Sequence, residues 1–417
     1  MVSNVKVMRN LGIIFLIVLI LGFLLLTISY MIPCENSFNQ INHNGDDILH
    51  TPKASIATYD TTRNDMYTDK IILSQISYYN HNVSLIENAM GGYRTDPGNF
   101  SQYISGEGES TIHDYPRYWH GHLVIYKPIF YFLDYEGFKV LNLFAELILV
   151  ISVLALMIER NLKNYCVPFL FSLFFIHLEV IGVSLQFSTV FNLMLLSLII
   201  LLKYKEFLFK DKRLLYYFLV VGMVTSYSDL LTYPLVTFAI PMIFCLLLEM
   251  DNNNLKDAIL KIVLFVVVWT VGYAGMWACK WVISSFVLNK DVITMALNQL
   301  LFRVDPNSYG DFSRIDAVLK NVLVYKKRAY MIIFAFIGVY YVKRLISHRK
   351  NIKVNKVKRV VPLLIMAAAP FVWYFVACNH SYIHYWFTYR ELLIFFLAIF
   401  CCAEYMIIDE MYNPNHT

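Results

Sequence analysis

The chain has 417 residues, of which 58% are hydrophobic and only 16% charged, and its formal net charge is +5. This composition excludes an ordinary soluble globular protein and predicts an all-α polytopic membrane protein. The clustered Lys and Arg residues fall in short loops, so we interpret them as signals that orient the chain in a lipid bilayer, and we expect no nucleic-acid partner.

Apolar stretches recur along the chain at lengths that predict about ten transmembrane helices, several of them short or tilted. The first stretch is longer than the apolar part of a secretory signal and no small-residue cleavage site follows it, so we expect it to remain as an anchor. The ten stretches are residues 11–31, 138–157, 166–183, 187–202, 214–227, 230–248, 259–287, 329–341, 360–377 and 391–408.

Basic residues predict the orientation of these helices. With Lys6 and Arg9 in the cytoplasm, alternation places the basic groups at 160–163, 203–213, 256–261 and 343–359 on the same side, as the positive-inside rule requires. We therefore predict a multi-pass protein of the cell membrane with both termini cytoplasmic. Its predicted parts are a cytoplasmic tip with the first helix, a large extracellular loop with surface helices, and a multi-helix transmembrane region, at residues 1–33, 34–127 and 128–417.

The large loop is much longer than a simple connection needs, so we expect it to fold and to carry chemistry. A carboxylate near the outer leaflet can deprotonate an acceptor hydroxyl if its pKa and its position are suitable. Asp69, at the start of a helical pattern, is the first candidate, followed by Asp60 and Asp47. The alternative for each is a solvated loop charge or a helix cap.

An aromatic and cationic cluster ends this loop. The fork-shaped guanidinium of an arginine suits a phosphate, and aromatic faces can stack against a sugar ring. The alternative is an aromatic belt at the membrane interface, with the arginine reaching toward water. The candidate substrate-binding residues here are Arg117, Tyr118, Trp119, His120 and His122.

Four further candidates lie elsewhere in the chain. His384 and Arg390 belong to a second aromatic segment predicted on the outer face, where belt packing again competes with function. Lys280 lies inside the seventh apolar stretch, where a charge is costly, and is a candidate for holding a lipid phosphate. Asp229 follows the fifth stretch and is either a helix cap or a site residue.

Four short motifs resemble a family of multi-spanning proteins found with surface-polysaccharide genes of Gram-positive bacteria. They are Tyr67-Thr68-Asp69, Arg117-Tyr118-Trp119-His120-Gly121, Ser228-Asp229-Leu230-Leu231-Thr232-Tyr233-Pro234 and Tyr385-Trp386-Phe387-Thr388-Tyr389-Arg390. The layout is also similar to that of the GT-C membrane glycosyltransferases, although the acidic pair that many of them carry soon after the first span is here Asp46-Asp47, about a dozen residues later.

Resemblance to GT-C enzymes implies a polyprenyl-phosphate-linked sugar as donor, an acidic catalytic residue in the first outer loop and, in some enzymes, a divalent metal such as Mg²⁺ or Mn²⁺. We therefore expect sugar transfer to a cell-surface glycan or glycolipid acceptor at the outer face. The short cytoplasmic loops leave no room for a nucleotide-binding domain, which agrees with a lipid-linked donor. The alternatives are a transporter or flippase and a polymerase for lipid-linked polysaccharide units.

Overall fold

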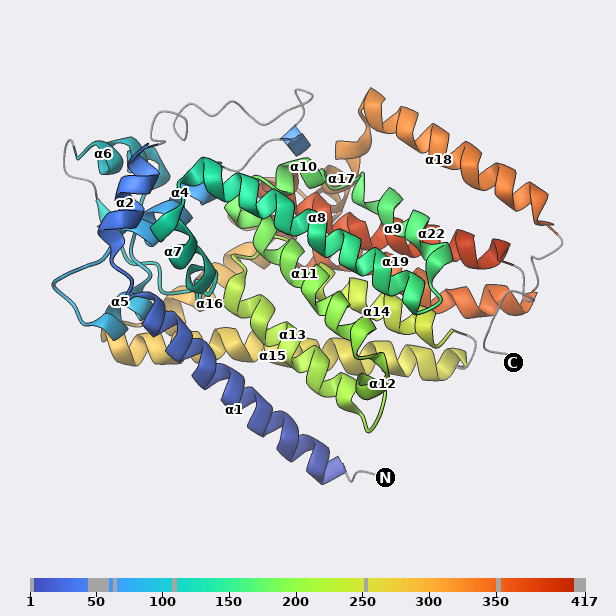
Figure 1. Cartoon of the computed structure of the whole chain (residues 1–417), viewed down its shortest axis with the longest axis horizontal. Coiled ribbons are helices and arrows are strands. Elements are labelled where there is room, and N and C mark those ends of the chain that lie inside the picture. The colour runs from blue at the N-terminus through green and yellow to red at the C-terminus, as the bar shows by residue number, and fades with distance from the viewer. Residues whose placement is uncertain are drawn as a thin grey trace.

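The computed structural model describes residues 4–43, 60–62, 66–106, 111–250, 254–349 and 354–408, which form an almost entirely helical molecule (Figure 1). In this part of the chain the strands are limited to β1 (Arg94–Thr95) and β2 (Ile112–His113), which pair antiparallel. The all-α class predicted from the sequence is confirmed.

The helices fall into two groups along the chain. The first helix and the large loop contain α1 (Asn4–Ser29), α2 (Cys34–His43), η1 (Asp60–Thr62), α4 (Met66–Ser77), α5 (Leu85–Gly91), η2 (Pro97–Asn99), α6 (Phe100–Ser105) and α7 (Leu123–Phe132). The remaining helices are α8 (Tyr135–Glu159), η3 (Lys163–Tyr165), α9 (Cys166–Leu173), α10 (Leu178–Ile181), α11 (Leu185–Lys203), α12 (Lys205–Leu208), α13 (Arg213–Ser228), α14 (Val236–Leu248), α15 (Leu255–Leu288), α16 (Val292–Val304), η4 (Pro306–Ser308), α17 (Arg314–Val322), η5 (Leu323–Tyr325), α18 (Arg328–Ser347), α19 (Val354–Val376), α20 (Cys378–Ile383), α21 (Tyr385–Thr388), η7 (Tyr389–Leu392) and α22 (Leu393–Ile407).

Six helices in the described residues are long and apolar enough to cross a membrane: α1, α8, α11, α15, α18 and most of α19. They match six of the ten predicted stretches and indicate a lipid bilayer environment. The other four stretches correspond to shorter helices, namely α9 with α10, α13, α14 and α22. The count of about ten crossings therefore stays a prediction.

The predicted stretch at 166–183 is not one continuous helix, because side chains from distant segments donate hydrogen bonds to two of its backbone carbonyls. The chain turns between α9 and α10, and His177 adopts a left-handed conformation with φ of 57°. The carbonyl of Phe175 accepts a hydrogen bond from the Tyr325 hydroxyl at 2.9 Å, and that of Ile176 accepts one from Arg390 Nε at 3.1 Å. These contacts replace the helical hydrogen bonds that an apolar environment would otherwise require.

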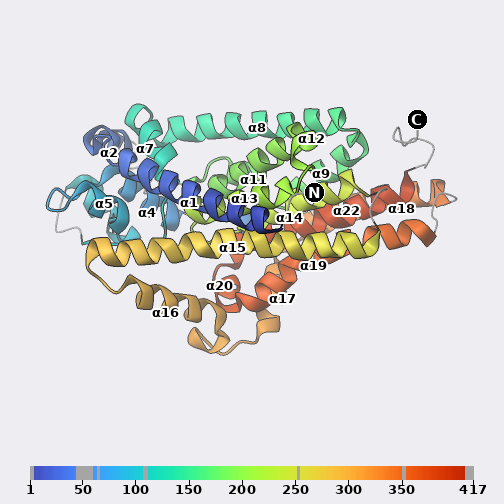
Figure 2. The same ribbon diagram turned by 90° about the horizontal axis from the view of Figure 1, so that it is seen from below.

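Helices α13 and α15 pack backbone against backbone through two glycines. A Cβ added at Gly222 would lie 2.2 Å from the carbonyl oxygen of Trp269, and one added at Gly272 would lie 2.4 Å from that of Leu219. Small residues permit such close approach of membrane helices. The 34-residue helix α15 is about 51 Å long at 1.5 Å per residue, and it extends alongside both the bundle and the large loop (Figure 2).

The basic groups at 160–163, 203–213 and 256–261 lie toward one end of the bundle, where α1 begins (Figure 1). Lys212 donates a hydrogen bond to Asn4 Oδ1 at 2.9 Å, and Arg160 donates two to the carbonyls of Leu202 and Lys203, each at 2.7 Å. This common location agrees with the predicted placement of these loops on a single side of the membrane.

The large loop folds against the opposite end and shares a hydrophobic core with the bundle. Trp119 and Leu123 from the loop pack with Leu26 of α1 and Met276 of α15. Within α4 the structure differs from the expectation of a surface helix, because its residues from Ile71 to Ser77 are buried. The polar and apolar alternation of this segment arises from a helix covered on several sides.

Candidate functional site

Three segments that are distant in the sequence hold one another near the end of the bundle that carries the large loop. They are residues 115–122, residues 227–235 and residues 380–391. Gly121 N donates to the Tyr227 carbonyl at 2.8 Å, and His380 Nε2 donates to the Leu231 carbonyl at 2.8 Å. Leu235 N in turn donates to Glu391 Oε1 at 3.0 Å. Three of the four sequence motifs thus meet in one region.

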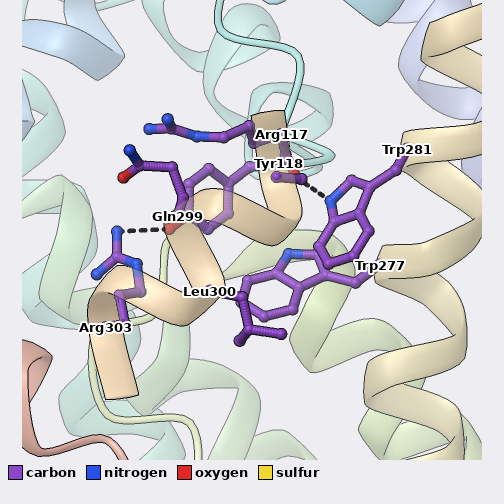
Figure 3. Close-up of a pocket in the computed structure, with 8 residues that line it drawn as sticks. Arg117, Tyr118, Trp277, Trp281, Gln299, Leu300 and Arg303 are labelled. Carbon is purple, nitrogen blue, oxygen red and sulfur yellow. Dashed lines mark hydrogen bonds between the residues drawn. The ribbon is translucent and has the colours of Figure 1, made fainter. Parts of the chain in front are cut away.

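A half-open pocket adjoins this region between α15 and α16 (Figure 3). The indoles of Trp277 and Trp281, with centroids 5.8 Å apart, form one side of it. The guanidinium groups of Arg117 and Arg303 lie on the other side, with the Gln299 amide between them (Figure 3). The full lining is Arg117, Tyr118, Trp277, Trp281, Ala296, Gln299, Leu300 and Arg303.

Arg303 is fixed by two neutral partners. Its Nη2 donates to the Tyr118 hydroxyl at 3.0 Å and its Nη1 donates to His380 Nδ1 at 2.5 Å. Burial raises the pKa of Tyr118 to about 12, so this hydroxyl keeps its proton at neutral pH and can offer it to a ligand. The Arg303 guanidinium remains a half-buried positive charge with further donors to offer.

Arg117 is the second half-buried cation of the pocket. Its guanidinium lies over the Tyr115 ring, 5.0 Å from the centroid, while its backbone carbonyl accepts a hydrogen bond from Trp281 Nε1 at 3.0 Å. Among the described residues neither Arg117 nor Arg303 forms an ion pair with a carboxylate. The pocket therefore concentrates positive charge beside aromatic faces.

The other predicted members of the 117–122 cluster are turned into the protein. Trp119 is fully buried and its Nε1 donates to the Met276 carbonyl at 2.7 Å. His120, at φ of 58°, donates from Nε2 to the Tyr115 carbonyl at 2.7 Å. His122 Nδ1 donates to the Ser228 carbonyl at 3.1 Å. These three residues position the loop and do not line the pocket.

Gly121 allows this loop to pack on α13. A Cβ at this position would lie 2.1 Å from Tyr227 Cδ1, and Tyr227 is held by its own hydrogen bond to the Gly22 carbonyl at 2.8 Å. We expect Gly121→Ala to lower the free energy of unfolding by about 2 kcal/mol, because the loop or Tyr227 must move. Thermal unfolding in detergent measures this, with Gly98→Ala as the control because its Cβ would meet nothing within 4 Å. Equal melting temperatures for the two variants would contradict the prediction.

Asp69, the first predicted base, caps α11. Its carboxylate is buried and accepts hydrogen bonds from Leu185 N and Gln186 N, each at 3.1 Å, and from the Ser184 hydroxyl at 3.3 Å. The Tyr135 hydroxyl donates a further one at 3.0 Å. A carboxylate in this position satisfies free N–H groups and the positive end of the helix dipole. To act as a base, Asp69 would have to exchange this cap for an acceptor hydroxyl.

The three other predicted carboxylates, Asp60, Asp47 and Asp229, differ in how far the structure describes them. Asp60 begins η1, at the edge of a gap in the described residues, and Asp47 lies outside those residues. Asp229 is buried and accepts hydrogen bonds from the backbone and the hydroxyl of Thr232. Asp229 thus caps the turn before α14, which is one of the two roles predicted from the sequence.

Lys280 and Arg390 satisfy backbone carbonyls. Lys280 Nζ donates to the Met90 carbonyl at 2.9 Å, where α5 ends, and is fully buried. Arg390 is also fully buried, and besides Ile176 it donates to the Trp386 carbonyl at 3.3 Å. A cation at free carbonyls complements the negative end of a helix. Lys280 thus connects α15 to the end of α5, and Arg390 connects η7 to the turn before α10. Neither residue lines the pocket.

Arg303, Trp277 and Trp281 did not emerge from the sequence as candidates. They belong to helices α15 and α16, and no local motif marks them. A signal that could have found Arg303 is its position at the end of an otherwise apolar helix facing the predicted outer side. For the divalent metal that some GT-C enzymes use, the described residues contain no group of three or more His, Cys, Asp or Glu side chains able to hold an ion.

Comparison of the chain with protein-family models, with curated proteins and with solved structures gave no match. The geometry of the site therefore carries the functional argument.

Proposed function

We propose that the protein is a membrane glycosyltransferase of GT-C-like organisation. It transfers a sugar from a polyprenyl-phosphate donor to a cell-surface glycan or glycolipid at the outer face of the cell membrane. The observation that carries this proposal is the pocket in which two indole rings face two guanidinium groups that pair with no carboxylate of the described residues.

The charges of the pocket suit a phosphate. Arginine binds phosphate through parallel N–H groups, and Arg303 is held in place by Tyr118 and His380 without losing its charge. A phosphate that leaves with the bonding electron pair gains negative charge in the transition state, and fixed cations stabilise that charge most strongly in a partly dry site. Arg117 and Arg303 are therefore assigned to the donor phosphate.

The aromatic side of the pocket suits a sugar. Trp277 and Trp281 present broad apolar faces, and Trp281 is oriented by its hydrogen bond to the Arg117 carbonyl. Pockets for small molecules combine such faces with a few polar groups that fix orientation, here the Gln299 amide and the Tyr118 hydroxyl. Both indoles belong to the C-terminal half of α15, away from the basic loops at the other end of the bundle.

Cells lacking the protein provide the first test, through mass spectrometry of their surface glycans and lipid-linked intermediates. We expect a polymer that lacks one sugar, together with accumulation of the polyprenyl-phosphate form of that sugar. The wild-type gene should restore the polymer, and so should the control Phe336→Ala, whose side chain is 73% exposed on α18. The double variant Trp277→Ala/Trp281→Ala should restore less than about a tenth of it, because both sugar-binding faces are removed.

Accumulation of an intermediate other than the polyprenyl-phosphate sugar would contradict the proposal. Complete lipid-linked repeat units in the deletion strain would identify a flippase or a polymerase instead. Labelling of those units from outside the cell would separate the two, since only a polymerase defect leaves them exposed at the outer face.

A further inference from the structure

Arg303 has the pocket on one side and a histidine cluster on the other. The cluster consists of His380 and His384, whose ring centroids are 4.9 Å apart, and Trp386, whose ring lies 5.2 Å from that of His384. These residues come from the segment between α19 and α22, which is separate from the elements that line the pocket. Arg303 thus contacts both the pocket lining and the histidine cluster, which come from different segments of the chain.

The two histidines differ in the use of their nitrogens. An arginine can only donate, so the contact between Arg303 and His380 Nδ1 requires an unprotonated Nδ1. His380 then carries its proton on Nε2 and donates it to the Leu231 carbonyl. Both nitrogens of His380 are engaged, and this ring has no lone pair left for a substrate.

His384 has a free nitrogen. Its Nδ1 is buried and has no hydrogen-bond partner among the residues that the structure describes, and the same is true of Trp386 Nε1. The His384 ring is stacked on Phe387, with centroids 5.1 Å apart and planes at 22°, so its orientation is fixed. The side chains of His384 and Trp386 are half-buried as a whole, although these two nitrogens are themselves shielded from solvent.

We propose that His384 and Trp386 form the acceptor subsite, in which His384 takes the proton of the acceptor hydroxyl and Trp386 holds the acceptor sugar. This inference rests on the proposed function and assigns to His384 the role of base that the sequence placed on Asp69. Burial and the nearby positive charge of Arg303 lower the pKa of His384 to about 4, so the ring is neutral at physiological pH. The charged and titratable groups identified around it are Arg303 of α16 and His380 of α20.

The step balances with no further reagent. The acceptor oxygen forms a bond to the anomeric carbon while its proton moves to the unprotonated nitrogen of His384. The bond between that carbon and the phosphate oxygen breaks, and its electron pair stays on the phosphate, which Arg303 binds. The products are the glycoside and the polyprenyl phosphate, and His384 returns the proton to solvent.

The test uses the purified full-length protein in proteoliposomes with a polyprenyl-phosphate sugar as donor and the glycan acceptor. We expect His384→Gln to lower kcat by about 100-fold or more, since general-base catalysis contributes 10² to 10⁴, and to leave the donor KM within about threefold. Imidazole should restore part of the activity of His384→Ala. Trp386→Leu should raise the acceptor KM. The control His348→Gln, an exposed position at the far end of α18, should resemble the wild type.

Three results would overturn the proposal. His384→Gln with kcat within threefold of the wild type would place the base elsewhere. A large loss in both His384 variants without rescue by imidazole, and with an unchanged pH profile, would indicate a purely structural histidine. Absence of transfer by the wild-type protein would reject the proposed function and this inference with it, whereas wild-type transfer with an active His384→Gln rejects the inference alone.

Discussion

An Asp69→Ala variant should lose folded protein more severely than the other single substitutions considered for this chain. The change removes both oxygens that cap α11 and leaves the Leu185 and Gln186 amides without their acceptor in a buried place. Buried donors without partners cost about 1 to 3 kcal/mol each, so the loss should reach about 3 kcal/mol or more. The measurement is thermal unfolding of the detergent-solubilised protein, followed by size-exclusion chromatography.

Two companion variants sharpen this prediction. Asp69→Asn keeps one carbonyl oxygen as an acceptor and should be destabilised less than Asp69→Ala. Asp311→Ala, at an exposed position, should be neutral. An Asp69→Ala protein that melts with the wild type but transfers no sugar would contradict a capping role and support the acid–base role predicted from the sequence.

Arg303→Ala should abolish most sugar transfer while leaving the protein folded. The guanidinium is half-buried and its two described partners, Tyr118 and His380, are neutral, so its removal leaves no buried charge unpaired. Loss of one donor to a developing anion costs about 10² to 10³ in rate, and we expect a fall in kcat/KM of at least about 100-fold. The measurement is transfer from a polyprenyl-phosphate sugar in proteoliposomes.

A conservative variant of Arg303 separates the effect of its positive charge from the effect of its fork-shaped geometry. Arg303→Lys keeps the positive charge but loses the fork that contacts Tyr118 and His380 together, so it should recover only part of the rate. The control is Arg349→Ala, which removes an exposed cation just after the C-terminal end of α18 and should leave sugar transfer normal. Transfer by folded Arg303→Ala within threefold of the wild type would remove Arg303 from the donor site.

Hydropathy was sufficient to predict the long helices. The predicted stretches at 11–31, 138–157 and 259–287 coincide with α1, α8 and α15, because their composition permits little else. The interruption of 166–183 was not predictable, since it depends on Tyr325 and Arg390, which lie 150 and 214 residues from the carbonyls they satisfy.

The site was predictable only in part, for a similar reason. Arg117 and Tyr118 line the pocket, but Trp119 and His120 turn inward because a left-handed residue and Gly121 bend the segment over α13. Charged residues such as Lys280 attract attention in an apolar sequence whether they bind a substrate or a helix end. A sequence does not separate the two, because the helix ends they cap belong to remote segments.

These remote caps have a consequence for biogenesis. The Met90 carbonyl at the end of α5 accepts its hydrogen bond from Lys280, which is translated 190 residues later. Asp69 accepts one from Leu185 N, which is translated 116 residues later. In the topology predicted from the sequence, the large loop crosses the membrane before the groups that complete its helices are translated. Its final fold forms only after Lys280 of α15 has been translated, although the loop is synthesised among the first parts of the chain.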